Sequence, residues 1–325
     1  MRVSVIIPYY NPDSDLLVQQ LLTRAVTSAW ESMNGVCDCQ IVVVNDGSPA
    51  IPDSILPAHI PVESITIPHR MLGGARNAGM DIATGDIILF LDADDMYVPG
   101  ALAPCVKAME SMDADVVAFG IKRVKGNRPV PACSSAKPVF SEPVSGDSYM
   151  SSRNFPACAW RYMIRAQFLR ENNLRFVENA YIEDEEFTPR MLHLARSFSE
   201  TTLPVYAYCI RQGSIITDNS KERIEARSAH TLQAISSLLA FREQHSGQPH
   251  RGLDRKISYL AMDHLRRTLR RDDWRTAVPA QKSALEQMGL FPLQGGYSLS
   301  FRFFSRLSRC KAGTALLHLI ESFYK

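Results

Sequence analysis

The sequence predicts an α/β fold with a mostly parallel central sheet, followed by a helical C-terminal region. Short continuous apolar runs alternate with helical patterns through the first 120 residues. Such runs are typical of strands that helices cover on both faces. From about residue 219 onward only helical patterns remain. In a sheet of this kind, ligands bind beyond the carboxyl ends of the strands.

The expected elements follow from these patterns in chain order. We expect strands at 3–7, 41–44, 62–67, 86–91, 115–119 and 201–210. We expect helices at 15–33, 74–83, 99–112, 164–172, 183–195, 219–245, 250–272 and 279–289. The segment 121–148 is rich in Pro, Ser, Lys and Gly, which favours an irregular insertion or hairpin over the site.

The net charge of +2 hides an asymmetry between two parts of the chain. Residues 1–220 hold 18 Lys and Arg against 25 Asp and Glu, whereas residues 221–325 hold 18 against 9. This change predicts two domains, at 1–218 and 219–325. A basic region favours contact with anionic lipid, an anionic acceptor or nucleic acid, or else forms solvated helix faces. No recognised nucleic-acid-binding module accompanies it, so no nucleic-acid partner is expected.

Seven scattered cysteines without a Cys-x-x-Cys pair indicate neither a disulfide framework nor a zinc site. This usage favours a reducing, cytoplasmic setting. The apolar run at 3–7 is too short for a signal peptide, and no run of 18 apolar residues predicts a membrane-spanning helix.

Three carboxylates follow directly on the strand expected at 86–91. Asp92 and Asp94 are two positions apart, so in an extended segment they share one side. Their mutual repulsion is relieved by a cation, and Mg²⁺ or Mn²⁺ takes oxygen ligands and bridges phosphates. The pattern predicts a metal-bound diphosphate at the end of this strand, although on its own a solvated turn would also explain it.

A second acidic cluster, 183–186, begins a predicted helix. Phe187, Met191 and Leu194 follow at i, i+4 and i+7 and define its buried stripe. Asp184 falls on that stripe three residues before Phe187, and Glu183 falls at its edge. Asp184 is therefore expected to point inward, where partial burial would raise its pKa and improve it as a base.

Five segments in order closely resemble family 2 glycosyltransferases: 3–11, 43–48, 74–79, 85–95 and 182–187. The resemblance spans about residues 1–215 and implies a Rossmann-like domain of the type called GT-A. It implies an inverting, metal-dependent enzyme that moves a sugar from a nucleotide sugar, expected to be UDP-linked, to an acceptor hydroxyl. The expected setting is polysaccharide or glycoconjugate synthesis, with a carbohydrate or lipid-linked acceptor.

The resemblance also implies roles for residues of the nucleotide side. Pro8, Tyr10 and Asp46 would hold the base and ribose, and Arg76 would lie against the base and orient an acidic residue. Asp94 would bind Mg²⁺ or Mn²⁺ directly, while Asp92 would contact the ribose, or the metal through water. Arg211 would reach the diphosphate as a second cation.

On the acceptor side, Asp184 matches the catalytic base, with Glu183 as the alternative. Trp160 matches a tryptophan that lines the acceptor side in relatives, although a core tryptophan explains it equally well.

Two other classes of protein remain open. The same scaffold would serve a catalytically silent protein that binds sugar nucleotides or glycans. A nucleotidyltransferase also uses paired acids and a metal, but the segment 8–11 is not the glycine-rich triphosphate loop that such an enzyme shows after its first strand.

Two features of the C-terminal region resemble no family. Arg266, Arg267, Arg270 and Arg271 form a basic ridge on one predicted helix. Residues 299–325 combine apolar and basic side chains, which is compatible with peripheral contact at the inner face of a membrane, with packing on the catalytic domain or with a second subunit.

Overall fold

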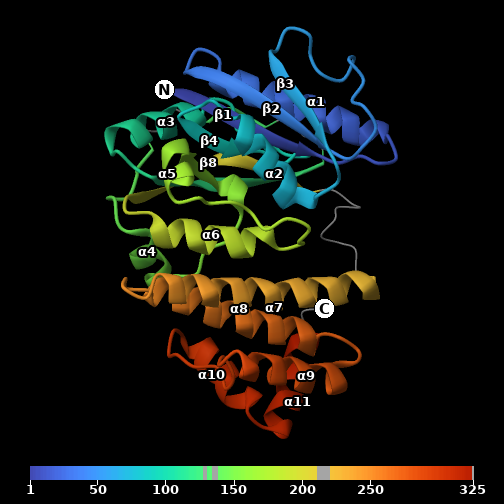
Figure 1. Cartoon of the computed structure of the whole chain (residues 1–325), viewed down its shortest axis with the longest axis vertical. Coiled ribbons are helices and arrows are strands. Elements are labelled where there is room, and N and C mark those ends of the chain that lie inside the picture. The colour runs from blue at the N-terminus through green and yellow to red at the C-terminus, as the bar shows by residue number, and fades with distance from the viewer. Residues whose placement is uncertain (127–129, 134–137, 211–219, 324–325) are drawn as a thin grey trace. The chain divides into compact units, whose positions relative to one another are not determined.

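The computed structural model describes residues 1–126, 130–133, 138–210 and 220–323. These residues form two compact units (Figure 1). The first unit comprises 1–146 and 156–220, and the second comprises 147–155 and 221–325. The segment 147–155 thus belongs to the helical unit, although the charge pattern had grouped it with the N-terminal domain.

The first unit is built on a sheet that has eight strands within the described residues, in the order β3-β2-β1-β4-β7-β6-β8-β5. The strands are β1 (Arg2–Tyr9), β2 (Asp38–Asp46), β3 (Val62–Ile67), β4 (Ile87–Phe90), β5 (Met96–Tyr97), β6 (Val116–Lys125), β7 (Tyr162–Arg165) and β8 (Phe198–Ile210). Strands β3, β2, β1 and β4 pair in parallel, as do β6 and β8. Strand β7 is antiparallel to both β4 and β6, and β5 is antiparallel to β8. The predicted α/β fold with a mostly parallel sheet is confirmed.

Among its described residues, the first unit has the helices α1 (Leu16–Met33), α2 (Met71–Ile82), α3 (Leu102–Ser111), α5 (Ala166–Glu171) and α6 (Glu183–Leu194), and the 3₁₀ turn η1 (Ala159–Arg161). Helix α1 begins where the Asp15 carboxylate accepts a hydrogen bond from the backbone N–H of Leu17. Helix α2 lies close on β1 because Gly79 has no side chain: a Cβ there would lie 2.3 Å from Ile6 Cγ2.

Two parts of the first unit differ from the prediction. The helix expected from residue 164 begins at Ala166, because Tyr162, Met163 and Ile164 form a fully buried strand between β4 and β6. An apolar run this short has no periodicity that separates strand from helix. The segment expected to be irregular from 121 continues β6 as far as Lys125, because it pairs with β8.

The second unit consists of α4 (Gly146–Ser152), α7 (Lys221–Gln244), α8 (Arg251–Leu269), α9 (Trp274–Gln287), α10 (Leu299–Ser308) and α11 (Lys311–Ser322). Helices α7 and α8 lie side by side (Figure 1). The Asp147 carboxylate accepts hydrogen bonds from the N–H groups of Gly252 and Leu253 at the start of α8, which ties 147–155 to this unit.

The basic ridge predicted on α8 is largely used inside this unit. Arg266 and Arg270 both bind the carboxylate of Glu321 on α11, at 2.6 Å each, and that side chain is only 4% exposed. Arg271 pairs with Asp273 at 2.7 Å. The arginines therefore join helices rather than form one free cationic surface.

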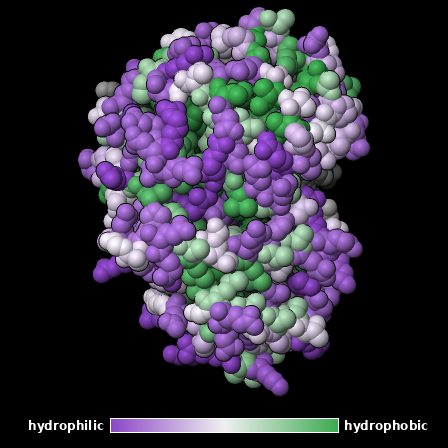
Figure 2. Space-filling model, viewed as in Figure 1, coloured by the Kyte–Doolittle hydropathy of each residue, from purple (hydrophilic) through white to green (hydrophobic). Residues whose placement is uncertain are grey.

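Apolar side chains fill the interior of the first unit between the sheet and its helices, while the face drawn in Figure 2 is mostly hydrophilic with smaller apolar areas. Among the described residues, no helix is both long and apolar enough to cross a membrane.

Candidate active site

The candidate site centres on Arg76 of α2, whose side chain is fully buried. Its Nη1 lies 2.9 Å from Glu183 Oε1 and 2.6 Å from Asp184 Oδ1. Its Nη2 lies 3.2 Å from Asp92 Oδ1. One guanidinium thus joins the acidic turn after β4 to the first turn of α6. The planar fork of arginine suits this task, because it presents several donors in fixed directions.

Aromatic rings hold the guanidinium of Arg76 in place. Its Cζ lies 5.7 Å from the ring centroid of Phe90 and 5.3 Å from that of Phe176. Phe176 stacks on Phe187 of α6, with centroids 3.8 Å apart. Asn77 fixes Phe176 in turn, since its side chain exchanges two 2.9 Å hydrogen bonds with the Phe176 backbone. The site therefore has a preorganised floor drawn from β4, α2 and α6.

Asp184 combines burial with an opening to solvent. Its side chain keeps 18% exposure, and its carboxylate accepts a hydrogen bond from the backbone N–H of Ala159. Burial raises the pKa of Asp184 to about 7, with Arg76 opposing this shift and Glu183 adding to it. A carboxylate with this pKa is suited to take a proton near neutral pH.

The neighbouring groups titrate under the same influences. Burial raises the pKa of Glu183, although Arg76 pulls it down. Burial also raises the pKa of Asp92 to about 6, against Arg76 and reinforced by repulsion from Asp94 and Asp184. For Arg76 itself, burial lowers the pKa, but the three acids outweigh it and leave the pKa above its ordinary value. The guanidinium is thus charged in the cluster at all working pH values.

Asp95 has a different role from Asp92 and Asp94. It is 1% exposed, and its two oxygens accept hydrogen bonds of 2.7 Å from the Tyr206 hydroxyl and the Cys209 backbone N–H. The Tyr206 oxygen accepts in turn from the N–H of Asp92 at 3.2 Å. Asp95 therefore ties the acidic turn to β8, and burial raises its pKa to about 8, with repulsion from Asp92 and Asp94 adding to the shift.

The residues at the acidic turn fit a hard divalent cation. Asp92 and Asp94 supply only oxygen donors, and Asp94 contributes to the raised pKa of Asp92, a repulsion that a cation would relieve. Within the described part of the chain, no group of three or more His, Cys, Asp or Glu side chains is arranged to hold a metal.

The residues predicted to hold a nucleotide lie where β1 and β2 end. Pro8 is buried within β1 opposite Val44, and Tyr10 follows the strand with 46% exposure. Asp46 is buried, and its Oδ1 accepts the N–H of Arg70 at 2.7 Å. Its Oδ2 lies 2.8 Å from His69 Nδ1. Because β2, β1 and β4 are neighbours, Asp46 and the acidic turn share one edge of the sheet.

Trp160 lies in η1, next to the residue that hydrogen-bonds Asp184. Its ring stacks on Tyr206 with centroids 4.2 Å apart, and lies nearly parallel to that of Tyr208 at 6.0 Å. It is partly buried against the core. Arg211, predicted to reach the diphosphate, lies outside the described residues.

Sequence reasoning placed the members of the acidic cluster with mixed success. Phe187 and Met191 are fully buried, whereas Leu194 is only half-buried. Glu183, assigned to the edge of the stripe, is 5% exposed and shares Nη1 of Arg76 with Asp184. Glu186, which the sequence did not place on the buried stripe, is also buried, and Arg190 one turn later pairs with it. His69 precedes Arg70 near the predicted nucleotide loop, and from the sequence a lone histidine there was interpreted as structural.

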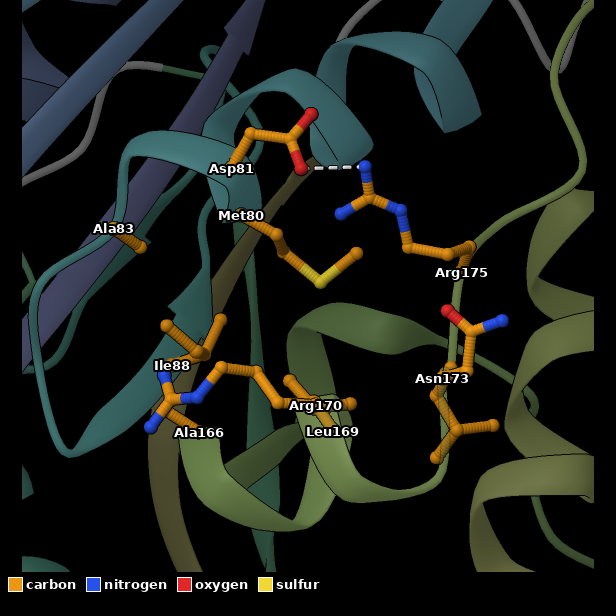
Figure 3. A pocket seen from close by; sticks show the side chains of 10 residues that line it. Met80, Asp81, Ala83, Ile88, Ala166, Leu169, Arg170, Asn173 and Arg175 are labelled. Atoms are coloured by element: carbon orange, nitrogen blue, oxygen red, sulfur yellow. Dashed lines mark hydrogen bonds and ion pairs between the residues drawn. The ribbon is translucent and has the colours of Figure 1, made fainter.

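A separate surface pocket of about 350 Å³ lies between the end of α2 and α5 (Figure 3). Leu169, Leu174 and Met80 line it, and Asp81 and Arg175 form an ion pair across it. None of the predicted site residues lines this pocket.

The fold and the acidic edge of the sheet define a protein of the GT-A class. Residues 4–144 match the family model described as Glycosyl transferase family 2. Over this segment the chain is similar to glycosyl transferase family 2.

Several relatives are similar over part of their length. An uncharacterized glycosyltransferase of Bacillus subtilis, EpsJ, is 28% identical over 57% of this chain and 54% of its own. The uncharacterized glycosyltransferase YibD of Escherichia coli is 25% identical over 66% and 63%. The succinoglycan biosynthesis protein ExoW of Rhizobium meliloti is 34% identical over 35% and 36%. The chain thus spans less than two thirds of the length of these curated relatives.

Among solved structures, residues 1–349 of S. aureus TarS in complex with UDP-GlcNAc are similar to this chain with a TM-score of 0.63. The match covers 99% of this chain and 89% of that one at 18% identity. The similarity shows that the two chains share a fold over both units.

Proposed function

We propose that this protein is an inverting glycosyltransferase that moves a sugar from a UDP-linked donor to an acceptor hydroxyl. The observation that carries the proposal is the bridge of Arg76 from Asp92 to Asp184. It sets a carboxylate suited to proton removal beside an acidic turn suited to a diphosphate and its cation.

Asp184 is the proposed general base. Its partly exposed carboxylate accepts the proton of the acceptor hydroxyl while the hydroxyl oxygen attacks the anomeric carbon. The attack comes from the face opposite the diphosphate, so a single displacement inverts the anomeric centre. Arg76 and the Ala159 N–H hold the carboxylate in place, and Trp160, adjacent to Ala159, is the proposed surface for the acceptor ring.

On the nucleotide side of the site, Tyr10 and Asp46 are proposed to hold the base and ribose, with Pro8 shaping the strand end beneath them. Asp94 and Asp92 are the residues that would hold Mg²⁺ or Mn²⁺. When bound, that cation would neutralise charge on the departing diphosphate. Arg76 fixes the orientation of Asp92 through the 3.2 Å contact.

Similarities to other proteins support the donor and the setting. The TarS chain of similar fold was solved with UDP-GlcNAc and with UDP. ExoW is named for succinoglycan biosynthesis, and a poly(ribitol-phosphate) beta-glucosyltransferase of Bacillus spizizenii is 26% identical over 65% of this chain. We therefore propose a role in polysaccharide or glycoconjugate synthesis, with a carbohydrate or lipid-linked acceptor.

We further propose that α10 and α11 touch an anionic lipid surface. Five apolar side chains on these helices or directly after α11 are 46–88% exposed: Leu299, Phe303, Leu316, Leu319 and Phe323. Arg302, Arg306 and Lys311 are exposed on the same two helices. Apolar side chains flanked by cations are complementary to an anionic membrane interface.

The substitution Asp184→Asn tests the catalytic assignment. The variant should bind UDP-sugar like the wild type but lose transfer by a factor on the order of 10² to 10⁴, because the amide cannot accept the proton. Glu171→Gln, an exposed change on α5, is the matched control and should transfer normally. Transfer by Asp184→Asn at the wild-type rate would exclude Asp184 as the base. A wild-type protein that binds UDP-sugars across a panel of donors and acceptors but never cleaves them would instead be a silent binding protein.

A further inference from the structure

We propose that His69 occupies the place of the nucleobase in the free protein and must swing away before a nucleotide binds. The proposal rests on the proposed function, because it takes Asp46 and Tyr10 as the residues that hold the base. It adds His69, which no motif indicated. It also adds a step in which a side chain of the protein competes with the nucleotide for the same site.

The position of the His69 ring carries the argument. Nδ1 lies 2.8 Å from Asp46 Oδ2, and the ring stacks on Tyr10 with centroids 4.4 Å apart and planes 24° apart. An ionised carboxylate only accepts hydrogen bonds, so the proton of this contact is on Nδ1. His69 thus presents a flat ring that donates a ring N–H to Asp46 and stacks on an aromatic side chain.

Uracil offers the same two features. It is a flat ring with one ring N–H, and it would use the Asp46 carboxylate and the Tyr10 face in the same way. The imidazole and the base therefore compete for one carboxylate oxygen and one aromatic face. Asp46 Oδ1 is already engaged by the backbone N–H of Arg70 at 2.7 Å, which leaves Oδ2 as the contested atom.

The His69 side chain is able to leave without disturbing the core. It is 46% exposed, whereas that of Asp46 is 4% exposed. The backbone of His69 lies close to that of Gly47, where φ is 80° and an added Cβ would lie 2.7 Å from His69 N. Rotation about the side-chain bonds moves the ring into solvent while the backbone stays. Binding that requires such a minor state has an affinity reduced by the fraction of protein in that state.

Titration calorimetry with UMP, which probes the base and ribose without a diphosphate, tests the proposal. His69→Ala should bind UMP about tenfold more tightly than the wild type, since one net hydrogen bond and its stacking no longer compete. His59→Ala, an exposed histidine elsewhere in the same unit, is the control and should bind like the wild type. Equal affinity of His69→Ala and the wild type would overturn the proposal, and so would weaker binding, which would make His69 a wall of the site.

A second measurement follows the ring itself. In the free protein, the His69 Nδ1–H should give a hydrogen-bonded ¹⁵N signal that UMP abolishes. Persistence of that signal at saturating UMP would overturn the proposal even if the affinities had changed. Asp46→Asn separates this failure from failure of the proposed function. If the wild type and every variant fail to bind UMP and UDP, or if Asp46→Asn binds as well as the wild type, the nucleotide assignment itself is wrong and the proposal falls with it.

Discussion

Arg76 and Asp184 are 108 positions apart in the chain, yet Nη1 of the first lies 2.6 Å from Oδ1 of the second. The guanidinium is fully buried and also contacts Glu183 and Asp92, so one cation faces three acids. Charges removed from water in this way are stable only while all the partners are present. The stability of this unit and the geometry of its site therefore depend on the same side chain.

Replacing Arg76 by Ala should destabilise the first unit by about 3–5 kcal/mol, because the buried acids then lose the guanidinium that pairs with them. Urea unfolding measures this, and transfer should be lost as well. Arg175→Ala removes a partly exposed ion pair with Asp81 and should cost about 1 kcal/mol or less. Equal losses in the two variants would contradict a special role for Arg76.

The activity should fall below about pH 7. A base must be deprotonated to act, and the pKa of Asp184 is raised to about 7, chiefly by burial. Below that value, kcat/KM should fall about tenfold per pH unit. Glu183→Gln removes a neighbouring negative charge that raises this pKa, so the acid limb should move to lower pH. If the acid limb of the Glu183→Gln variant lies at the same pH as that of the wild type, the charge of Glu183 does not act on the titrating group.

How much of this site the sequence revealed differs between residues. Asp92, Asp94 and Asp184 were singled out because strand ends and helical periodicity locate carboxylates along the chain. Arg76, the common partner of Asp92 and Asp184, could not be derived that way, since its contacts depend on how α2, β4 and α6 pack. The resemblance to relatives, not periodicity, had singled out Arg76.

In the fold, too, elements with a local sequence pattern were predicted, whereas one that depends on tertiary pairing was not. Strands with continuous apolar runs, such as β1 and β2, were located to within a few residues. Strand β7 was missed because four residues inserted antiparallel between β4 and β6 are specified by tertiary pairing, not by local pattern. The burial of Glu186 has a different basis, because its partner Arg190 is an i,i+4 neighbour on the same helix and makes burial tolerable.

Tyr206→Phe should destabilise the acidic turn. The change removes the donor to the buried Asp95 and the acceptor for the Asp92 N–H, at a cost of about 1–3 kcal/mol. Thermal unfolding should show the loss, and the turn should bind nucleotide less well. Tyr208→Phe on the same strand keeps its ring beside Trp160 and is the control. A Tyr206→Phe protein as stable as the wild type would mean that Asp95 finds another partner.

Removal of divalent cations by a chelator should abolish transfer and weaken UDP binding, and Mn²⁺ or Mg²⁺ should restore both. Asp94→Ala should bind UDP weakly with or without the cation, because a carboxylate ligand is gone. Calorimetry with and without Mn²⁺ measures this. The Asp81→Ala variant, an acid remote from the turn, should keep the cation dependence. If Mn²⁺ does not change the affinity of the wild type for UDP, the metal assignment is wrong.

The exposed apolar face of α10 and α11 predicts selective recovery of the full chain with lipid. In flotation, vesicles containing phosphatidylglycerol should carry the protein upward, whereas pure phosphatidylcholine should carry much less, because cations flank the apolar side chains. The triple change Phe303→Ser, Leu319→Ser and Phe323→Ser should abolish flotation without unfolding, since these residues are 53–88% exposed. Leu16→Ser, at a leucine 63% exposed on α1, is the matched control and should float like the wild type. Arg302→Glu with Arg306→Glu should weaken binding to anionic vesicles and make it less sensitive to salt. Equal flotation of the wild type and the triple variant would show that this face does not meet lipid.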